Sequence, residues 1–307
     1  MSAPLIECVP NVSEGRDGAL IDCLAEAVPA PGVTLLDRTS DPDHHRTVFT
    51  FAGTPDAVED AMMRVAALAF EHIDLDKHQG VHPRIGAVDV VPFVPLRGIS
   101  LATCAERARA FARRYAERFK VPVYLYEASA LRPERVSLPN IRRGGYEELK
   151  KSIVIDPDRA PDYGPAILSG AGASVIGARN PLIAFNAFLD TADVAVARAV
   201  ARGLRASSGG LPYVRAIGVA VRGRAQVSIN VIDFRLTSLY TIMRTLQTLA
   251  SAHHAAVVET ELIGLIPQAA LLHAAAEFLQ LPSTAVSATL ERRLGDATAD
   301  YREVTFE

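Results

Sequence analysis

The sequence predicts an α+β fold built from two ferredoxin-like subdomains side by side, each with the element order βαββαβ. The chain has 307 residues, enough for two domains of ordinary size. Hydrophobic residues make up 49% of it, which suits two buried cores. In both halves, apolar strand-like runs are separated by runs with helical spacing, in the same order. We therefore expect subdomains at residues 1–179 and 180–307.

The first half shows this order with an extension at its end. Apolar residues such as Val58, Met62, Val65 and Ala69 recur at helical spacing and predict a long helix at 56–73. The expected elements are a strand at 6–10, a helix at 18–28, strands at 33–37 and 46–52, a helix at 56–73, a strand at 86–93, a helix at 101–119 and a strand at 121–126.

The second half gives the βαββαβ order followed by a closing helix. A tight turn at Arg222-Gly223-Arg224 joins its two middle strands, and Ser238 or Thr237 is a candidate N-cap. The expected elements are strands at 182–188, 213–221, 225–232 and 257–262 and helices at 192–205, 238–250 and 268–279. The polar, proline-rich passage from 130 to 165 is expected to join the halves, either as a solvated connector or as a wall of the active site.

Composition excludes several classes of function. The net charge is −3 and no basic run is present, so nucleic-acid binding is disfavoured. No apolar window is long enough to span a bilayer, and the N-terminus lacks the pattern of a signal peptide, so we expect no membrane association. Three scattered cysteines, Cys8, Cys23 and Cys104, are expected to be free, buried thiols in a reducing cytoplasm.

The strongest candidate for chemistry is His82. Gly80, Pro83 and Gly86 constrain its loop, which leads into an apolar strand and can therefore hold a titratable group in fixed geometry. Histidine is well suited to move protons near neutral pH. His78 and His82 are four residues apart, as zinc ligands on a helix are, but the glycine and proline disfavour a helix. We expect a proton-transfer role and no metal.

Two further segments have alternative interpretations. Between two strands, residues 37–47 combine acids, histidines and an arginine that could orient a base and bind a carboxylate, or form a solvated turn. Asp41, Asp43 and His45 also resemble metal ligands, without an evident fourth. Near the start, Ser13 or Asn11 is expected to cap a helix, and the same backbone amides could instead hold an anionic group.

A third segment, residues 161–179, is dense in small residues. Such residues let a flat ring system approach and hydrogen-bond the backbone, although a flexible linker would have the same composition. It contains neither GxGxxG nor a Gly-Lys-Ser/Thr sequence, so a nucleotide site is not indicated. Arg179, just before a strand, would suit a ligand carboxylate.

Taken in order, these segments resemble the motifs of the glutamate formimidoyltransferase family, in its stand-alone bacterial-type form. The resemblance runs through residues 7–15, 41–48, 78–84, 161–165, 177–179 and 183–186. It implies transfer of a formimidoyl group between N-formimidoyl-L-glutamate and tetrahydrofolate in histidine degradation. It also implies a folate tunnel between the two subdomains, a homodimer, tetrahydrofolate as co-substrate and no metal. Because the fused cyclodeaminase domain of animal members does not follow, a separate cyclodeaminase is expected.

The resemblance also implies roles for individual residues. The catalytic histidine of the family falls on His82, and Asp41 or Asp43 is its expected acidic partner. From the chemistry of their side chains rather than from the resemblance, Arg46, Arg84 and Arg179 are expected to bind the carboxylates of the substrate. The residues expected to contact folate are Gly164, Pro165, Ala166, Ile167, Leu168, Ser169, Gly170, Ala171 and Gly172.

Some positions depart from the family pattern. Thr39 stands where animal members carry an aspartate, and His45 stands where bacterial-type members often have Asn. The folate segment lacks the tryptophan of animal members, since the chain has none. Three alternatives remain open on the sequence: formyl transfer from N-formylglutamate, folate binding without turnover, and a metal-dependent hydrolase built on His78, His82 and the 41–45 loop.

Overall fold

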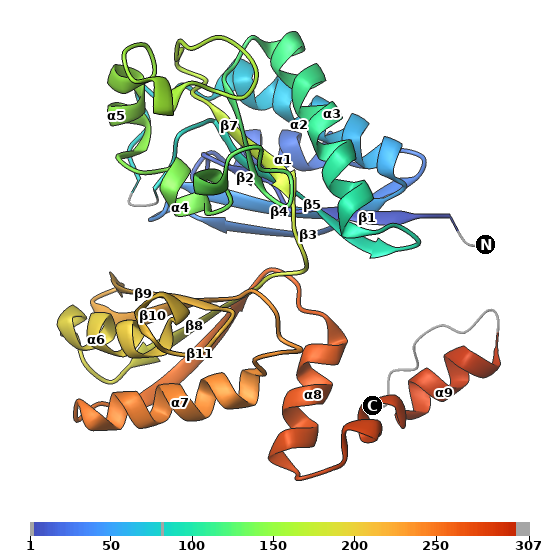
Figure 1. Cartoon of the computed structure of the whole chain (residues 1–307), viewed down its shortest axis with the longest axis vertical. Helices are drawn as coiled ribbons and strands as arrows, with labels where there is room; N and C mark the ends of the chain where they lie inside the picture. The colour runs from blue at the N-terminus through green and yellow to red at the C-terminus, as the bar shows by residue number, and fades with distance from the viewer. Residues whose placement is uncertain (1–2, 81–82, 299–307) are drawn as a thin grey trace. The chain divides into compact units, whose positions relative to one another are not determined.

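The chain divides into two compact units, and the boundary along the chain lies between Asn180 and Pro181 (Figure 1). The computed structural model describes residues 3–80 and 83–298. His82 therefore lies outside the described residues. Each unit is described by itself below.

The first unit is a sheet covered by helices. Its elements are β1 (Leu5–Cys8), β2 (Asn11–Val12), α1 (Gly18–Glu26), β3 (Val33–Asp41), β4 (Arg46–Gly53), α2 (Pro55–His72), β5 (Val88–Arg97), α3 (Leu101–Phe119), β6 (Val123–Glu127), η1 (Pro133–Arg135), α4 (Leu138–Ile141), α5 (Gly145–Ser152), η2 (Pro157–Arg159) and β7 (Ser174–Ala178). Strands β1 and β2 both lie between β4 and β5, and β3 pairs with β4. This is the ferredoxin-like arrangement, extended beyond β5 by β7 and β6 in parallel.

Helices α1, α2 and α3 lie over one face of this sheet (Figure 1). Aromatic residues join α3 to the sheet: the rings of Phe93 and Phe111 pack edge to face at 5.1 Å between centroids, and Tyr115 follows at 5.6 Å from Phe111. Ser100 caps the start of α3, because its hydroxyl accepts the N–H of Thr103 at 3.1 Å. Apolar burial on this face thus fixes the sheet that carries the site.

The second unit has the complete ferredoxin-like topology. Its elements are β8 (Ile183–Leu189), α6 (Val194–Leu204), η3 (Ala206–Ser208), β9 (Val214–Val221), β10 (Arg224–Val231), α7 (Leu239–Ala252), β11 (Val257–Ile263), α8 (Gln268–Phe278), η4 (Ser283–Ser287) and α9 (Leu290–Ala297). The antiparallel sheet has the order β11-β8-β10-β9, so the first strand lies between the fourth and the third. As expected, Ser238 caps α7 by accepting the N–H of Thr241. The predicted fold class is confirmed. No helix of the described residues is long and apolar enough to cross a membrane.

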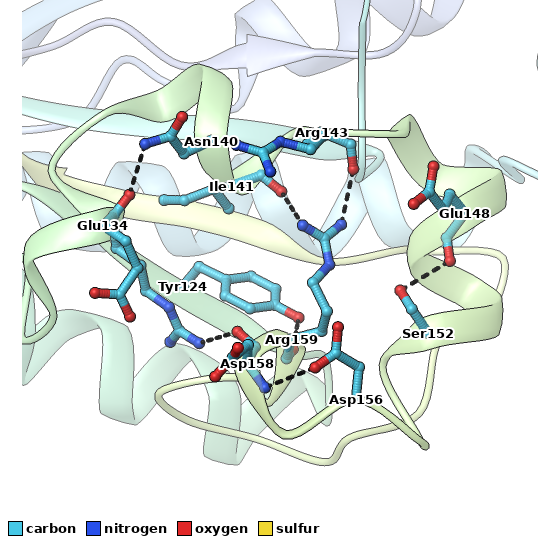
Figure 2. Close-up of a pocket in the computed structure, with 11 residues that line it drawn as sticks. Tyr124, Glu134, Asn140, Ile141, Arg143, Glu148, Ser152, Asp156, Asp158 and Arg159 are labelled. Atoms are coloured by element: carbon cyan, nitrogen blue, oxygen red, sulfur yellow. Dashed lines mark hydrogen bonds between the residues drawn. The ribbon is translucent and has the colours of Figure 1, made fainter.

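The passage from 130 to 165 does not join the two units, contrary to expectation. It carries η1, α4, α5 and η2 and belongs to the first unit. Arg135 anchors it, because this arginine is 3% exposed and its Nη1 lies 2.7 Å from the carboxylate of Asp162. These elements surround a pocket of about 350 Å³, across which Arg159 donates to the carbonyl oxygens of Ile141 and Arg143 (Figure 2).

Two further details differ from the sequence-based interpretation. The small-residue segment includes a strand, β7, which the sequence pattern did not reveal because its five residues follow a glycine-rich run. Its backbone pairs with β5 and β6, so the segment is not a flexible linker. Cys8 and Cys104 are buried thiols as expected, but Cys23 is exposed on α1.

Candidate functional site

Three loops of the first unit meet near the start of β5. Gly15 allows the loop before α1 to touch the β3–β4 turn, because a Cβ there would lie 2.4 Å from the carbonyl oxygen of Asp41. Gly80 allows the loop that leads to His82 to touch the same turn, because a Cβ there would lie 2.7 Å from the carbonyl oxygen of His44. The loop before α1, the β3–β4 turn and the loop that leads to His82 are therefore in backbone contact.

Glu14 fills the anion-binding position at the start of α1. Its Oε1 accepts the N–H groups of Gly15, Arg16 and Asp17 at 2.9, 2.8 and 3.0 Å. Nε2 of His45 lies 3.0 Å from the same oxygen. Burial acts to raise the pKa of Glu14, but these hydrogen bonds outweigh it and the pKa is lowered. The backbone amides expected to hold an anion are thus occupied by the chain's own carboxylate.

The expected cap of α1 was wrong in its residue. Asp17 is the N-cap and accepts the N–H of Leu20 at 3.1 Å. Ser13 instead donates to the carbonyl oxygen of Gly86 at 2.7 Å, which ties the first loop to the start of β5.

Replacing Glu14 by Gln is expected to lower stability in a pH-dependent way. A carboxyl whose pKa is lower in the folded than in the unfolded state stabilises the fold fully at pH values above its unfolded-state pKa. This stabilisation is lost as the pH falls through its folded-state pKa. The ordinary pKa of a glutamate side chain is 4.5. The variant should therefore be less stable than wild type by about 1 kcal/mol at about pH 6. The difference should vanish toward about pH 3.

Denaturant unfolding at several pH values measures this difference. Glu26→Gln is the matched control, because Glu26 ends the same helix and is exposed. A gap between wild type and Glu14→Gln that persists unchanged down to about pH 3 would contradict the assignment.

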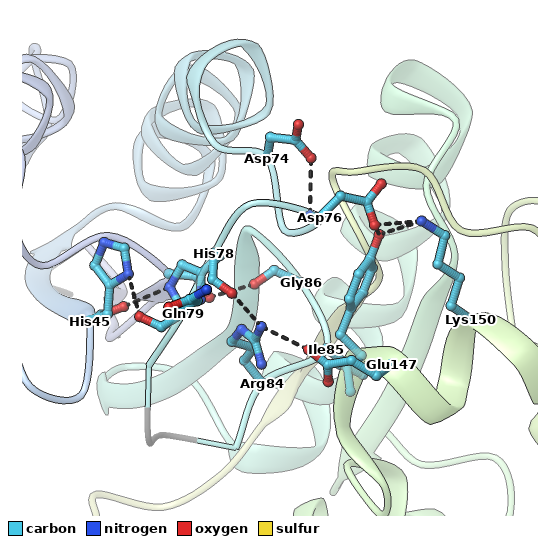
Figure 3. A network of polar contacts seen from close by, with 12 residues as sticks. His45, Asp74, Asp76, His78, Gln79, Arg84, Ile85, Gly86, Glu147 and Lys150 are labelled. Atoms are coloured by element: carbon cyan, nitrogen blue, oxygen red, sulfur yellow. Dashed lines mark hydrogen bonds and ion pairs between the residues drawn. The ribbon is translucent and has the colours of Figure 1, made fainter.

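His45 and His78 form a stacked pair beside Glu14 (Figure 3). Their ring centroids are 4.1 Å apart and nearly parallel, at 10°. Nδ1 of His45 lies 3.1 Å from the carbonyl oxygen of Gln79, so both nitrogens of this ring face atoms that only accept.

The ring of His78 has one bonded nitrogen and one that is not bonded. Its Nε2 donates to the carbonyl oxygen of His45 at 3.0 Å, while Nδ1 is buried without a partner among the described residues. Burial, followed by the nearby charges of His45 and Arg84, lowers the pKa of His78. A ring with one unused nitrogen, that of His78, therefore stacks on the ring of His45, shortly before His82 in the sequence.

Asp41 pairs with His44. Its Oδ2 lies 2.7 Å from Nδ1 of that histidine, and its Oδ1 accepts the N–H groups of Asp43 and His44 at 2.9 Å. Burial opposes ionisation, but the hydrogen bonds from His44 outweigh it and the pKa of Asp41 is lowered. His45, which the alternative interpretation placed in a metal site with Asp41 and Asp43, lies against Glu14 instead. In the described part of the chain, no group of three metal-ligating side chains is assembled.

Two of the three arginines expected to bind carboxylates lie at this site. Arg84 is 9% exposed, and its Nη2 donates to the carbonyl oxygen of His78 at 2.9 Å and to Glu147 at 3.0 Å (Figure 3). Arg46 starts β4, directly after the His44-His45 turn. Burial and then the charge of Arg142 lower its pKa.

Arg179 lies at the other end of the parallel strands. It follows β7, and its N–H donates to the carbonyl oxygen of Phe93 at 3.0 Å. Arg84 precedes β5, to which β7 is parallel. Within the first unit, the length of a strand therefore separates Arg179 from Arg84.

The expected folate segment divides into two parts. Its end packs against the first unit's own backbone: Gly170 accepts from Leu75 at 2.7 Å, Ala171 accepts from Ala87 at 2.9 Å, and a Cβ on Gly172 would lie 2.3 Å from the carbonyl oxygen of Ile85. Residues 164–167 are exposed, whereas Leu168 is buried. The small residues at the end thus serve the packing of the site loop, whereas residues 164–167 and Ser169 are open to a ligand.

Sequence reasoning missed a buried ion pair between Asp89 and Arg142. Asp89 is 2% exposed, and its Oδ1 accepts the N–H of Ile85 at 2.8 Å. Burial raises its pKa, against the charge of Arg142. The signal was present, because an acid inside the apolar run 86–93 requires a buried partner. The partner comes from the 130–165 passage, whose placement the sequence did not give.

Fold and site together define a class of protein: a two-subdomain, ferredoxin-like α+β protein with histidines, carboxylates and arginines gathered in loops of its first unit. Family models identify the chain further. Residues 5–179 match the N-terminal subdomain of the formiminotransferase domain, and residues 184–293 match the formiminotransferase domain. The chain belongs to the formiminotransferase family.

Individual relatives agree with this assignment. The chain is 43% identical to a glutamate formimidoyltransferase of Streptococcus pyogenes, over 91% of this chain and 94% of the relative. It is 38% identical to a glutamate formimidoyltransferase of Thermoplasma acidophilum, over 95% and 98%. Against the formimidoyltransferase-cyclodeaminase of Mus musculus the identity is 42%, over 89% of this chain and 52% of the relative.

Proposed function

We propose that the protein transfers a formimidoyl group between N-formimidoyl-L-glutamate and tetrahydrofolate, giving 5-formimidoyltetrahydrofolate and L-glutamate in histidine degradation. The observation that carries this proposal is the similarity to two glutamate formimidoyltransferases over nearly the full length of each. Tetrahydrofolate is then a co-substrate, and we extend the proposal to a homodimer.

The residues of the site suit this chemistry. N5 of the reduced pterin forms a bond to the amidine carbon, and the bond from that carbon to the glutamate nitrogen breaks. The attacking amine loses a proton and the departing nitrogen gains one, so a single imidazole at His82 can serve both steps. The ionised Asp41 stabilises the positive amidinium, and Arg46 and Arg84 bind the carboxylates of glutamate.

An assay of purified protein with tetrahydrofolate and N-formimidoyl-L-glutamate tests the function. Mass spectrometry should show 5-formimidoyltetrahydrofolate and free glutamate in equal amounts. A parallel reaction with N-formylglutamate distinguishes formyl transfer. Stoichiometric folate binding without product from either donor would overturn the proposal and leave a binding protein.

Within the proposed folate segment, Ile167 is the residue expected to touch the ligand. Ile167 is 67% exposed in a loop of small residues, where an aromatic ring system can cover it. Ile167→Ala should raise the KM for tetrahydrofolate about tenfold, because the contact loses apolar area, with little change in kcat.

Steady-state kinetics at saturating donor measure this change. Ile155→Ala is the matched control, since Ile155 is 80% exposed in the same unit but outside the folate segment. Equal, small changes in both variants would show that the exposed part of the segment does not contact folate.

A further inference from the structure

The exposed part of the proposed folate segment is a short loop that is held at both ends. Residues 164–167 are exposed. Before them, the carbonyl oxygen of Tyr163 accepts the N–H of Val123 on β6 at 2.8 Å. After them, Leu168 is 7% exposed and belongs to the core of the first unit. A loop whose ends are fixed loses little further conformational freedom when a ligand binds to it.

The second anchor continues at Ser169, whose carbonyl oxygen has two donors. The N–H of Gly172 donates to it at 2.9 Å, which closes a turn within the segment. The hydroxyl of Tyr146 donates to it at 3.2 Å. Tyr146 is 2% exposed and comes from α5, so its hydroxyl ties the folate segment to the passage from 130 to 165.

The same hydroxyl has a competing acceptor. Tyr146 Oη lies 2.8 Å from Oδ1 of Asp76, and that oxygen also accepts from Nζ of Lys150 (Figure 3). A tyrosine hydroxyl carries one hydrogen, so at any moment it donates either to Asp76 or to Ser169. Because Lys150 gives Asp76 a second donor, the hydrogen of the hydroxyl is available to Ser169.

The loop that carries Asp76 also contacts the segment directly. The N–H of Leu75 donates to the carbonyl oxygen of Gly170 at 2.7 Å. A Cβ on Gly170 would lie 2.4 Å from Oδ1 of Asp74, so Asp74 can approach this closely only because residue 170 has no side chain. These contacts hold the end of the segment without the hydroxyl. Loss of the hydroxyl should therefore loosen the exposed part rather than unfold the unit.

We propose that Tyr146 positions the folate segment for tetrahydrofolate through the carbonyl oxygen of Ser169. This inference rests on the proposed function and adds to it a positioning residue for the acceptor substrate. The hydroxyl keeps residues 164–167 in one arrangement before tetrahydrofolate binds, so less conformational entropy is lost on binding. Its removal should weaken the binding of tetrahydrofolate and leave the donor and the chemical step unchanged.

Tyr146→Phe removes the hydroxyl and keeps the ring. It should raise the KM for tetrahydrofolate about fivefold, the factor expected for one hydrogen bond, while kcat and the KM for N-formimidoyl-L-glutamate change less than about twofold. The dissociation constant of tetrahydrofolate, titrated without donor, should rise by the same factor. The matched control is Tyr124→Phe, because the hydroxyl of Tyr124 donates to the carbonyl oxygen of Arg159 at 2.6 Å in the same passage. The control should leave all these constants unchanged.

A second comparison identifies the acceptor through which the hydroxyl acts. In an Asp76→Ala background, Tyr146→Phe should still raise the KM for tetrahydrofolate about fivefold, because Ser169 remains. If the effect disappears in this background, the hydroxyl acts through Asp76 and the inference is wrong. Equal changes of the KM values for both substrates, or no difference from Tyr124→Phe, would also overturn it. A wild-type protein that forms no 5-formimidoyltetrahydrofolate would instead overturn the proposed function, while the titration still tests the role of Tyr146.

Discussion

Replacing His82 by Ala is expected to lower kcat by about 10²–10⁴-fold, the range typical for loss of a general acid–base group. The expectation comes from the sequence, where His82 stands on a loop constrained by glycine and proline and matches the catalytic histidine of the family. Tetrahydrofolate affinity should change little, because the variant retains the residues proposed to contact folate. Turnover at saturating substrates and a separate folate titration measure the two effects.

His72→Ala is a suitable control, since His72 is exposed at the end of α2. A His82→Ala variant that keeps more than about half of the wild-type turnover would show that another group is the base.

Treatment with a strong chelator should leave the wild-type rate unchanged. If chelation abolished activity and zinc restored it, His82 would be a ligand rather than a base.

Gly172→Ala is expected to destabilise the first unit by about 3–5 kcal/mol. Gly172 has a φ of +70°, and an added Cβ would lie 2.3 Å from the carbonyl oxygen of Ile85 and 2.7 Å from Cα of Gly86. Both neighbours are backbone atoms of the segment that starts β5, so they cannot move aside as a side chain does. Denaturant unfolding followed by circular dichroism measures the loss.

Gly223→Ala separates the two causes of this loss. Gly223 has a φ of +72°, but nothing lies within 4 Å of the Cβ position. This control should lose only the conformational part, about 1 kcal/mol. Equal losses in the two variants would show that the backbone contact at Ile85 is not restrictive. A large loss at Gly172 would also mean that a substitution there cannot be used to test folate binding, because it changes the stability of the fold.

The ferredoxin-like elements were predictable because their signals are local. Helix α3 was expected at 101–119 and is found at Leu101–Phe119, since a capping serine and a regular apolar stripe define it. Strand β3 was expected to end at 37 but continues to Asp41 through residues that alternate between half-buried and exposed. Polar residues there suggested a loop, whereas the strand is held by its pairing with β4.

The candidate site was predictable only in part. Arg46, Arg84 and Asp41 were proposed from their positions in polar loops, and the structure brings these loops into contact, but their roles stay predictions. Arg142 was not found, because its role depends on the packing of a passage that lacks periodicity. The bond from His45 to Glu14 was missed for a similar reason: 31 residues separate them, and neither residue type specifies the other.

The place of β7 in the sheet has a consequence for synthesis of the chain. β7 is the strand that joins β6 to β5, with Val175 beside Val90 and Tyr124. A nascent chain that ends between residues 127 and 173 contains β5 and β6 but not the strand between them, so their facing edges have no partner. The first unit therefore cannot complete its sheet until Ala178 has left the ribosome. Any fragment made for expression must extend through that residue.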